Sequence, residues 1–334
     1  MTSLAEKISG AFPKKRIVII GDLVADQFLH GTIARVSREA PVFILRHDET
    51  DTRPGAAANA AANVADLGAC PILIGTVGDD ESGRLLLKCL AASGVDCRNV
   101  VTDPLGRTTT KVRVLAGQHY AARQQVIRID YEGAAAVTAP VKNELMERLD
   151  AAAAAADAIV ISDYNYGVAC PDVFEAALRL SRENSIPLIT DSRFRLAEFG
   201  NATAATPNQE EVEQLTGGEM DHEKCEGLRQ KLGLAALLVT RGNKGMVLYR
   251  EGHSALSLGP VGSTEPIDVT GAGDTVIAAF ALGLASGLDF AESAAAANHA
   301  GGIVVMKKGT ATVSAAELFD SLSSNRPDSL ESAA

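Results

Sequence analysis

The chain has 334 residues, 46% hydrophobic and 22% charged, which is typical of a folded domain with a large core and excludes gross disorder. Its net charge is −11 and no basic run appears, so neither nucleic acid nor an anionic membrane is expected as a partner. No apolar run is suited to spanning a bilayer, and the N-terminus lacks the apolar core of a signal peptide. Five cysteines without a C-x-x-C pair fit a reduced, cytoplasmic protein.

The first predicted strand covers residues 15–20, which read KRIVII, and ends at Gly21. Asp22 follows it directly, and Asp26 lies four residues further on. Ligands of open α/β sheets bind at the carboxyl ends of strands, so both aspartates are placed to bind substrate hydroxyls. A turn or a helix cap is the alternative role for each carboxylate.

Two segments alternate polar and apolar residues, about 31–48 and 106–131. Alternation predicts strands with one covered and one solvated face, unlike the buried strands of a parallel sheet. We therefore expect a single domain over residues 1–334, with these segments forming a small discontinuous sheet and a frayed polar tail at 321–334.

Residues 53–68 read RPGAAANAAANVADLG. Pro54 and Gly55 predict a turn, and the alanine-rich run predicts a helix. Asn59 and Asn63 are poor helix-interior residues that would share one face of this helix, so they need a reason. Substrate binding is one reason, and a local cap or a helix–helix hydrogen bond is the other.

Strand and helix patterns then alternate, which predicts a mostly parallel sheet with helices on both faces. Carboxylates recur at strand ends, as at Asp163 and in the Asp191-Ser192-Arg193 sequence. Asn208 and Glu211 follow a further strand, where helix capping and a solvated face are the alternatives to a ligand site.

Residues 266–287 read PIDVTGAGDTVIAAFALGLASG. They predict a β-type run ending at Thr270, a glycine turn and a helix. The first amides of a helix lack partners within it and favour an anion. A carboxylate at this position, Asp274, can accept a proton from a hydroxyl that attacks a bound phosphate. An ordinary turn with a helix-start acid is the alternative.

The DVTGAGDT sequence resembles the C-terminal signature of the PfkB, or ribokinase-like, carbohydrate kinases, and the resemblance extends over residues 15–320. It implies a ribokinase-like α/β fold: a central, mostly parallel sheet flanked by helices on both faces, with the small sheet as a lid over the sugar. It implies that Asp274 is the catalytic base and that Gly271, Ala272 and Gly273 form the anion hole. ATP and Mg²⁺ are then the expected cofactors, and a homodimer through the lid is the expected assembly.

The same resemblance assigns further residues. Asp22, Gly55 and Asn59 match substrate-binding positions, although Ala56 stands where a second glycine is common. Asn208 and Glu211 resemble an Asn-x-x-Glu motif tied to Mg²⁺ through water and to phosphate. The loop around Asp268 matches a potassium site. The expected ATP-binding residues are Asn208, Thr240, Arg241, Gly242, Gly245, Asn298 and Gly309.

Several segments, including RVSREAPV, SDYNYG and VTRGNKGM, are similar to the family members that phosphorylate the 1-hydroxyl of D-glycero-D-manno-heptose 7-phosphate. The distal phosphate of such a sugar needs cations, for which the candidates are Lys111, Arg113, Arg128 and Arg193. Surface charge is the alternative for each. Tyr166 and Arg193 both stand where lysine is common in those kinases.

Three other functions remain open at this point. The chain could phosphorylate another sugar or a nucleoside, such as ribose, fructose phosphate or adenosine. It could be an inactive sugar-phosphate sensor. A NAD-dependent dehydrogenase is disfavoured because no Gly-x-Gly-x-x-Gly follows the first strand. No His-x-Gly-His motif is present, so the nucleotidyltransferase domain of the bifunctional heptose enzymes is not expected.

Overall fold

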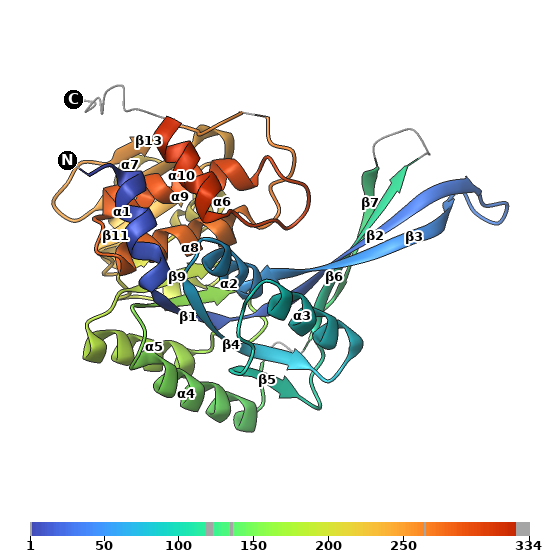
Figure 1. Ribbon diagram of the computed structural model, residues 1–334, viewed down its shortest axis with the longest axis horizontal. Coiled ribbons are helices and arrows are strands. Elements are labelled where there is room, and N and C mark those ends of the chain that lie inside the picture. The colour runs from blue at the N-terminus through green and yellow to red at the C-terminus, as the bar shows by residue number, and fades with distance from the viewer. Residues whose placement is uncertain (1, 118–122, 134–135, 264, 325–334) are drawn as a thin grey trace.

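The computed structural model describes residues 2–117, 123–133, 136–263 and 265–324. Within these residues, nine strands form the main sheet (Figure 1). Their order across the sheet is β13 (Leu256–Leu258), β12 (Met246–Arg250), β11 (Ala236–Thr240), β10 (Ala204–Ala205), β9 (Leu188–Ser192), β8 (Ala158–Asp163), β1 (Arg16–Gly21), β4 (Cys70–Gly78) and β5 (Val100–Asp103). Among these described strands, the β11–β12 and β12–β13 pairs are antiparallel and the other pairs are parallel. The predicted α/β class with a mostly parallel sheet is confirmed.

Strand β1 shows why the sheet is covered on both faces. Successive side chains of a strand point to opposite faces, and every residue of β1 after Arg16 is buried. Ile17 and Ile19 pack into one apolar cluster, while Val18 and Ile20 pack into another. Each face of the sheet therefore needs its own layer of helices.

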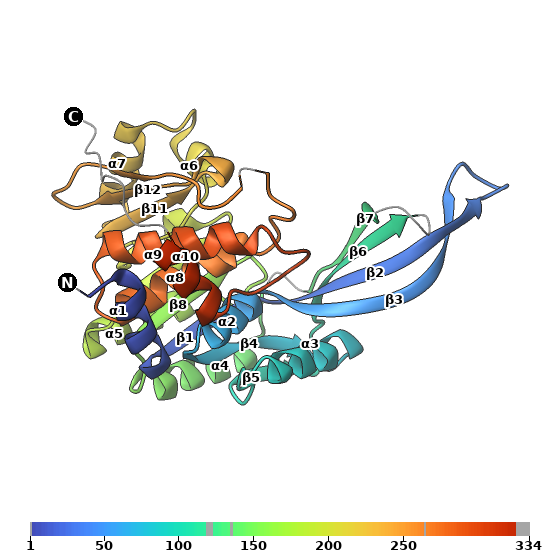
Figure 2. The same ribbon diagram turned by 45° about the horizontal axis from the view of Figure 1, so that its top comes forward.

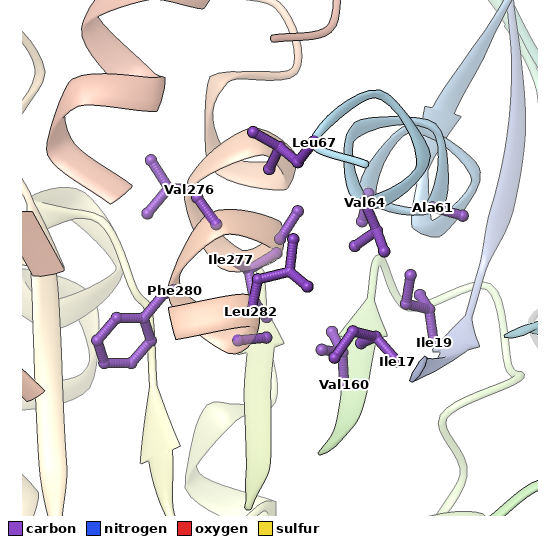
Figure 3. Close-up of a cluster of buried hydrophobic side chains, with 14 of the residues drawn as sticks. Ile17, Ile19, Ala61, Val64, Leu67, Val160, Val276, Ile277, Phe280 and Leu282 are labelled. Atoms are coloured by element: carbon purple, nitrogen blue, oxygen red, sulfur yellow. The ribbon is translucent and has the colours of Figure 1, made fainter. Parts of the chain in front are cut away.

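The first cluster is built with α1 (Leu4–Ala11), α2 (Ala57–Asp66), α3 (Glu81–Ala92), α8 (Ala272–Ala285), α9 (Phe290–Val304) and α10 (Ala315–Ser324). Figure 3 shows α2 and α8 meeting over β1, with Val64 and Ile277 beside Ile17 and Ile19. The second cluster is built with α4 (Ala139–Ala153), α5 (Pro171–Asn184), α6 (Gln209–Thr216) and α7 (His222–Lys231). Short 3₁₀ helices span η1 (Phe12–Lys14), η2 (Leu196–Glu198) and η3 (Gly242–Lys244). No described helix has the length and apolarity needed to cross a membrane.

A second sheet projects from the body of the molecule (Figures 1 and 2). This small sheet has the order β3 (Phe43–Ala56), β2 (Leu23–Val36), β6 (Thr109–Gly117) and β7 (Gln124–Tyr131). Its strands reach further into the body than the predicted segment 31–48, because β2 starts directly after Asp22. Residues 118–122 of the predicted segment 106–131 lie outside the described residues.

Three local predictions are wrong. Pro54 and Gly55 do not form a turn, since they pair with Ala25 and Val24 within the β2–β3 ladder. Residues 265–270 form a loop instead of a strand, because the amides of Ile267 and Asp268 bond the carbonyl of Val305. The predicted frayed tail began at residue 321, yet α10 continues to Ser324; residues 325–334 lie outside the described residues.

Candidate active site

Asp274 lies in the first turn of α8, with only 2% of its surface exposed. Its Oδ1 accepts a hydrogen bond from the hydroxyl of Tyr164 at 2.8 Å, and its Oδ2 accepts one from Nδ2 of Asn59 at 2.9 Å. Burial raises the pKa of Asp274 to about 7, against the opposing effect of these two hydrogen bonds, and the charge of Asp26 adds to the rise. The group is therefore poised to take up a proton near neutral pH.

Gly271 makes this arrangement possible. It precedes α8 with a φ of 79°, a conformation that disfavours side chains. A Cβ at this position would also lie 2.5 Å from Nδ2 of Asn59. A glycine here therefore allows α8 to begin close enough to α2 for Asn59 to reach Asp274.

The amides at the start of α8 form a candidate anion site. The amide of Ala272 bonds the carbonyl of Val269 at 3.2 Å. Among the described residues, the amides of Gly273 and Asp274 have no acceptor. Unpaired amides at the positive end of a helix dipole attract an anion.

A polar cavity adjoins this helix start and brings several predicted residues together. Gly271, Ala272 and Gly273 line it on one side, and Asn208 and Glu211 on another. Asn208 and Glu211 also form a capping box, each accepting the other's amide at 2.9 Å. Asn208 and Glu211 therefore cap α6 and line the cavity at the same time.

Asp191 is a cavity residue that the sequence pattern placed only at a strand end. Burial and the negative charges of Glu211, Asp274 and Asp163 raise its pKa well above the usual value, and burial raises the pKa of Glu211. A cation would relieve this crowding. In the described part of the chain no three acidic, His or Cys side chains are arranged to hold a metal ion by themselves. A cation held by few protein ligands and by water, as Mg²⁺ prefers, suits these residues.

A second, mostly apolar cavity shares Ala272 and Gly273 with the first. Its lining includes four residues predicted to bind ATP: Thr240, Gly242, Gly245 and Asn298. The two cavities thus meet at the start of α8, next to Asp274, as a nucleotide with its phosphates requires.

Arg241 and Gly309 do not line that pocket. Gly309 lies instead against the small sheet, where an added Cβ would be 3.2 Å from Nη1 of Arg53. Asp268 accepts the amides of Thr270 and Gly309, both at 2.9 Å. Burial raises the pKa of Asp268 and these hydrogen bonds lower it, and the net shift is downward. Asp268 therefore stays a carboxylate and links its own loop to the loop that contains Gly309.

Near the small sheet, the carboxylates of two predicted substrate-binding residues already accept hydrogen bonds from the protein. Asp22 accepts the amides of Tyr164, Tyr166 and Val168 at 2.8–3.1 Å. Asp26 accepts Nη1 of Arg113 at 2.5 Å and the hydroxyl of Thr310 at 3.0 Å. Gly55 lets the backbone approach, since its Cβ would lie 2.6 Å from Oδ2 of Asp26.

The four predicted cations differ in what they contact. Arg113 is paired with Asp26, and Arg128 is paired with Asp130 on the exposed strand β7. Lys111 is buried, 5.5–5.6 Å from the ring centres of Tyr164 and Tyr166, and has no salt-bridge partner among the described residues. Burial lowers its pKa, and the charge of Arg193 adds to this.

Arg193 is exposed and lines the polar cavity. The neighbouring Asp163 is fully buried and accepts Oγ of Ser192 at 2.6 Å and Nη2 of Arg195 at 2.5 Å. The sequence offered no sign of Arg195, because two arginines flank Phe194 and nothing distinguishes the one that turns inward. Tyr164 was also missed as a site residue, although its place after a strand end is a usable signal.

Comparisons with known proteins bear on the family and the fold of this chain. The family described as pfkB family carbohydrate kinase matches residues 14–317. The Bifunctional protein HldE of Azorhizobium caulinodans is 40% identical over 309 residues, which cover 90% of this chain and 63% of that protein. That of Geobacter sulfurreducens is 37% identical over 311 residues, covering 91% and 62%. The chain thus spans less than two thirds of the length of these relatives.

Solved structures show the same ribokinase-like fold. Arabidopsis thaliana ribokinase complexed with ribose and ATP has a TM-score of 0.70 and 20% identity, covering 92% of this chain and 98% of that one. Phosphofructokinase-2 from Escherichia coli in complex with potassium has a TM-score of 0.74 and 20% identity, covering 92% and 99%. The predicted fold is confirmed by both.

Proposed function

This chain belongs to the PfkB family of carbohydrate kinases, and we propose that it transfers the γ-phosphate of ATP to the 1-hydroxyl of D-glycero-D-manno-heptose 7-phosphate, in the cytoplasmic synthesis of ADP-heptose for lipopolysaccharide. The observation that carries the proposal is the buried carboxylate of Asp274 beside unpaired helix amides. The similarity to the HldE proteins supports the choice of sugar.

The proposed chemistry assigns each group at the start of α8 a part. The acceptor oxygen forms a bond to the γ-phosphorus, and the bond from that phosphorus to the β–γ bridging oxygen breaks, so that ADP leaves. The hydroxyl proton passes to Asp274, whose pKa of about 7 suits it to this transfer. The amides of Gly273 and Asp274 stabilise the charge on the transferring phosphoryl group.

Mg²⁺ would be held near Asp191 and Glu211, whose raised pKa values reflect burial and, at Asp191, the negative charges around it. It would supply charge neutralisation at the β- and γ-phosphates. Potassium beside the Asp268 loop is a further proposal, supported by the hydrogen bonds that fix this carboxylate between two loops.

The preference for a phosphorylated sugar rests on local cations. The chain carries a net charge of −11, which repels anions at long range, but screening beyond about 8 Å leaves the near groups to decide. Lys111 has no salt-bridge partner among the described residues, and Arg193 is exposed at the cavity wall. Arg193 can meet a distal phosphate directly, and the buried Lys111 adds positive charge near Arg193.

A screen with Mg·ATP tests the proposal, using heptose 7-phosphate, unphosphorylated heptose, fructose 6-phosphate, ribose and adenosine as acceptors. We expect heptose 7-phosphate to be used far better than the others. Arg193→Ala should raise KM for this substrate and leave KM for ATP nearly unchanged. Equal use of phosphorylated and free heptose would refute the heptose 7-phosphate assignment, and no transfer to any acceptor would favour a sugar-phosphate sensor.

A homodimer through the small sheet completes the proposal. The small sheet exposes large apolar side chains on its edge strand β7, among them Ile127 and Ile129, and at the start of β3, where Phe43 lies. Apolar faces and open strand edges of this kind are usually covered by a partner. Light scattering at assay concentration should give twice the chain mass, and replacing Ile127 and Ile129 with Lys should give the monomer mass.

A further inference from the structure

One contact of the proposed base comes from a residue to which no role has been assigned. The hydroxyl of Tyr164 donates to Oδ1 of Asp274 at 2.8 Å. We propose that Tyr164 is a positioning residue for Asp274, whose hydroxyl fixes the carboxylate and favours its charged form. This inference rests on the proposed function, because it takes Asp274 to be the base.

A hydrogen bond to Asp22 holds the backbone of Tyr164 in place. Asp22, with 1% of its surface exposed, accepts the amide of Tyr164 and two further amides of the same loop. Asn165 adopts a left-handed conformation with a φ of 64°, which turns the chain directly after the tyrosine. Because the backbone is anchored in this way, the ring of Tyr164 holds its hydroxyl at one position beside Asp274.

Two donors on different elements orient the carboxylate. Asn59 on α2 donates to Oδ2, while Tyr164 after β8 donates to Oδ1. With both oxygens held, the plane of the carboxylate is fixed relative to the start of α8. General base catalysis depends on this alignment with the acceptor hydroxyl.

The charged groups around Asp274 do not replace this contact. Asp26 on β2 is already paired with Arg113 at 2.5 Å. Lys111 on β6 lies 5.5 Å from the ring centre of Tyr164, and its charge favours the charged form of Asp274, but less than the hydrogen bonds from Asn59 and Tyr164 do. Asp191 on β9, when ionised, disfavours the charged form of Asp274. A neutral hydroxyl donor counteracts burial without adding another charge.

The pH dependence of kcat/KM with Mg·ATP and D-glycero-D-manno-heptose 7-phosphate tests the role. In Tyr164→Phe, the acid limb should move up by about one to two pH units, which matches the strength of a hydrogen bond to a charged group. Tyr166→Phe is a matched control, because its ring lies 5.6 Å from Lys111 but its hydroxyl donates to Glu132. The control should leave the limb in place, and an unmoved limb in Tyr164→Phe would overturn the inference.

A double-mutant cycle supplies a readout that needs no activity. The free energy of unfolding is measured for the parent, Tyr164→Phe, Asp274→Asn and the double variant, at pH 4.5 and pH 8.5. The coupling should be stronger at pH 8.5, where Asp274 is ionised, and a coupling independent of pH overturns the inference. If the cycle behaves as expected but Asp274→Asn keeps its turnover, the proposed function fails while the contact itself stands.

Discussion

The buried carboxylate of Asp274 should make the protein less stable as the pH rises. Its pKa increases from 3.8 to about 7 on folding, so the folded state binds a proton more tightly than the unfolded chain does. Raising the pH from about 4 to about 7 therefore lowers the free energy of unfolding, by at most about 4 kcal/mol at about 1.36 kcal/mol per unit. Above pH 7 the penalty is constant.

In Asp274→Asn the free energy of unfolding should not fall with rising pH in this way, because an amide does not ionise. Part of the gain is lost, since the new Nδ2 would face Nδ2 of Asn59, which now donates to Oδ2 at 2.9 Å. Flipping the side-chain amide of Asn59 would break the hydrogen bond that Nδ2 of Asn63 donates to Oδ1 of Asn59 at 3.2 Å. One mismatched buried hydrogen bond costs about 1–2 kcal/mol. A net gain of about 2 kcal/mol is expected at pH 8.5, and none at pH 4.5, where most of the penalty is absent.

Urea unfolding of parent and variant at the two pH values measures the difference. Turnover with Mg·ATP and the sugar phosphate should fall by ~10² to 10⁴, the usual contribution of a general base. The prediction thus joins a gain in stability to a loss of activity. A stability difference that is the same at both pH values would refute the reasoning from burial, and turnover near that of the parent would remove Asp274 as the base.

Three further changes can be tested. Ala56 has a φ of 56°, so Ala56→Gly should raise the free energy of unfolding by about 1 kcal/mol, measured by urea unfolding; no gain would show that the residue is unstrained. Glu211→Gln should raise the Mg²⁺ concentration needed for half-maximal rate, and an unchanged requirement would exclude Glu211 from the metal site. Arg195→Ala should destabilise the fold by about 3 kcal/mol or more, because it leaves Asp163 buried without its cation, whereas exposed Arg193→Ala should stay within about 0.5 kcal/mol.

The sequence predicted the fold well because its strongest signals are local and periodic. The buried strands β1, β8 and β11 appear as short apolar runs, and the glycine turn before α8 as a short motif. It failed where tertiary contacts decided the conformation. Pro54 and Gly55 are turn residues by propensity, yet they lie in a strand because both pair with β2. At Gly55, the close approach of Asp26 also requires a residue without a side chain.

Ala56 shows how the structure explains a departure from the family pattern. Glycine is common at this position, and the φ of 56° and ψ of −133° give the reason, because this conformation disfavours any side chain. The residue ends β3 and directly precedes α2, three residues before Asn59. The strained conformation therefore lies at the start of the helix that carries Asn59.

The strand-end carboxylates mark the limit of sequence reasoning about this site. Asp22, Asp163, Asp191 and Asp274 look alike in the sequence, each following an apolar run or a turn. Asp22 is occupied by three amides and Asp163 by Arg195 and Ser192, so both stabilise the walls of the site. Asp191 lines the polar cavity, Asp274 lies at the helix start beside it, and both have strongly raised pKa values. Groups of this kind are where a cation or a proton is taken up. The kind of partner differs as well: three amides for Asp22, a cation for Asp163 and two neutral side-chain donors for Asp274. Which partner lies within reach depends on tertiary contacts that no local pattern specifies.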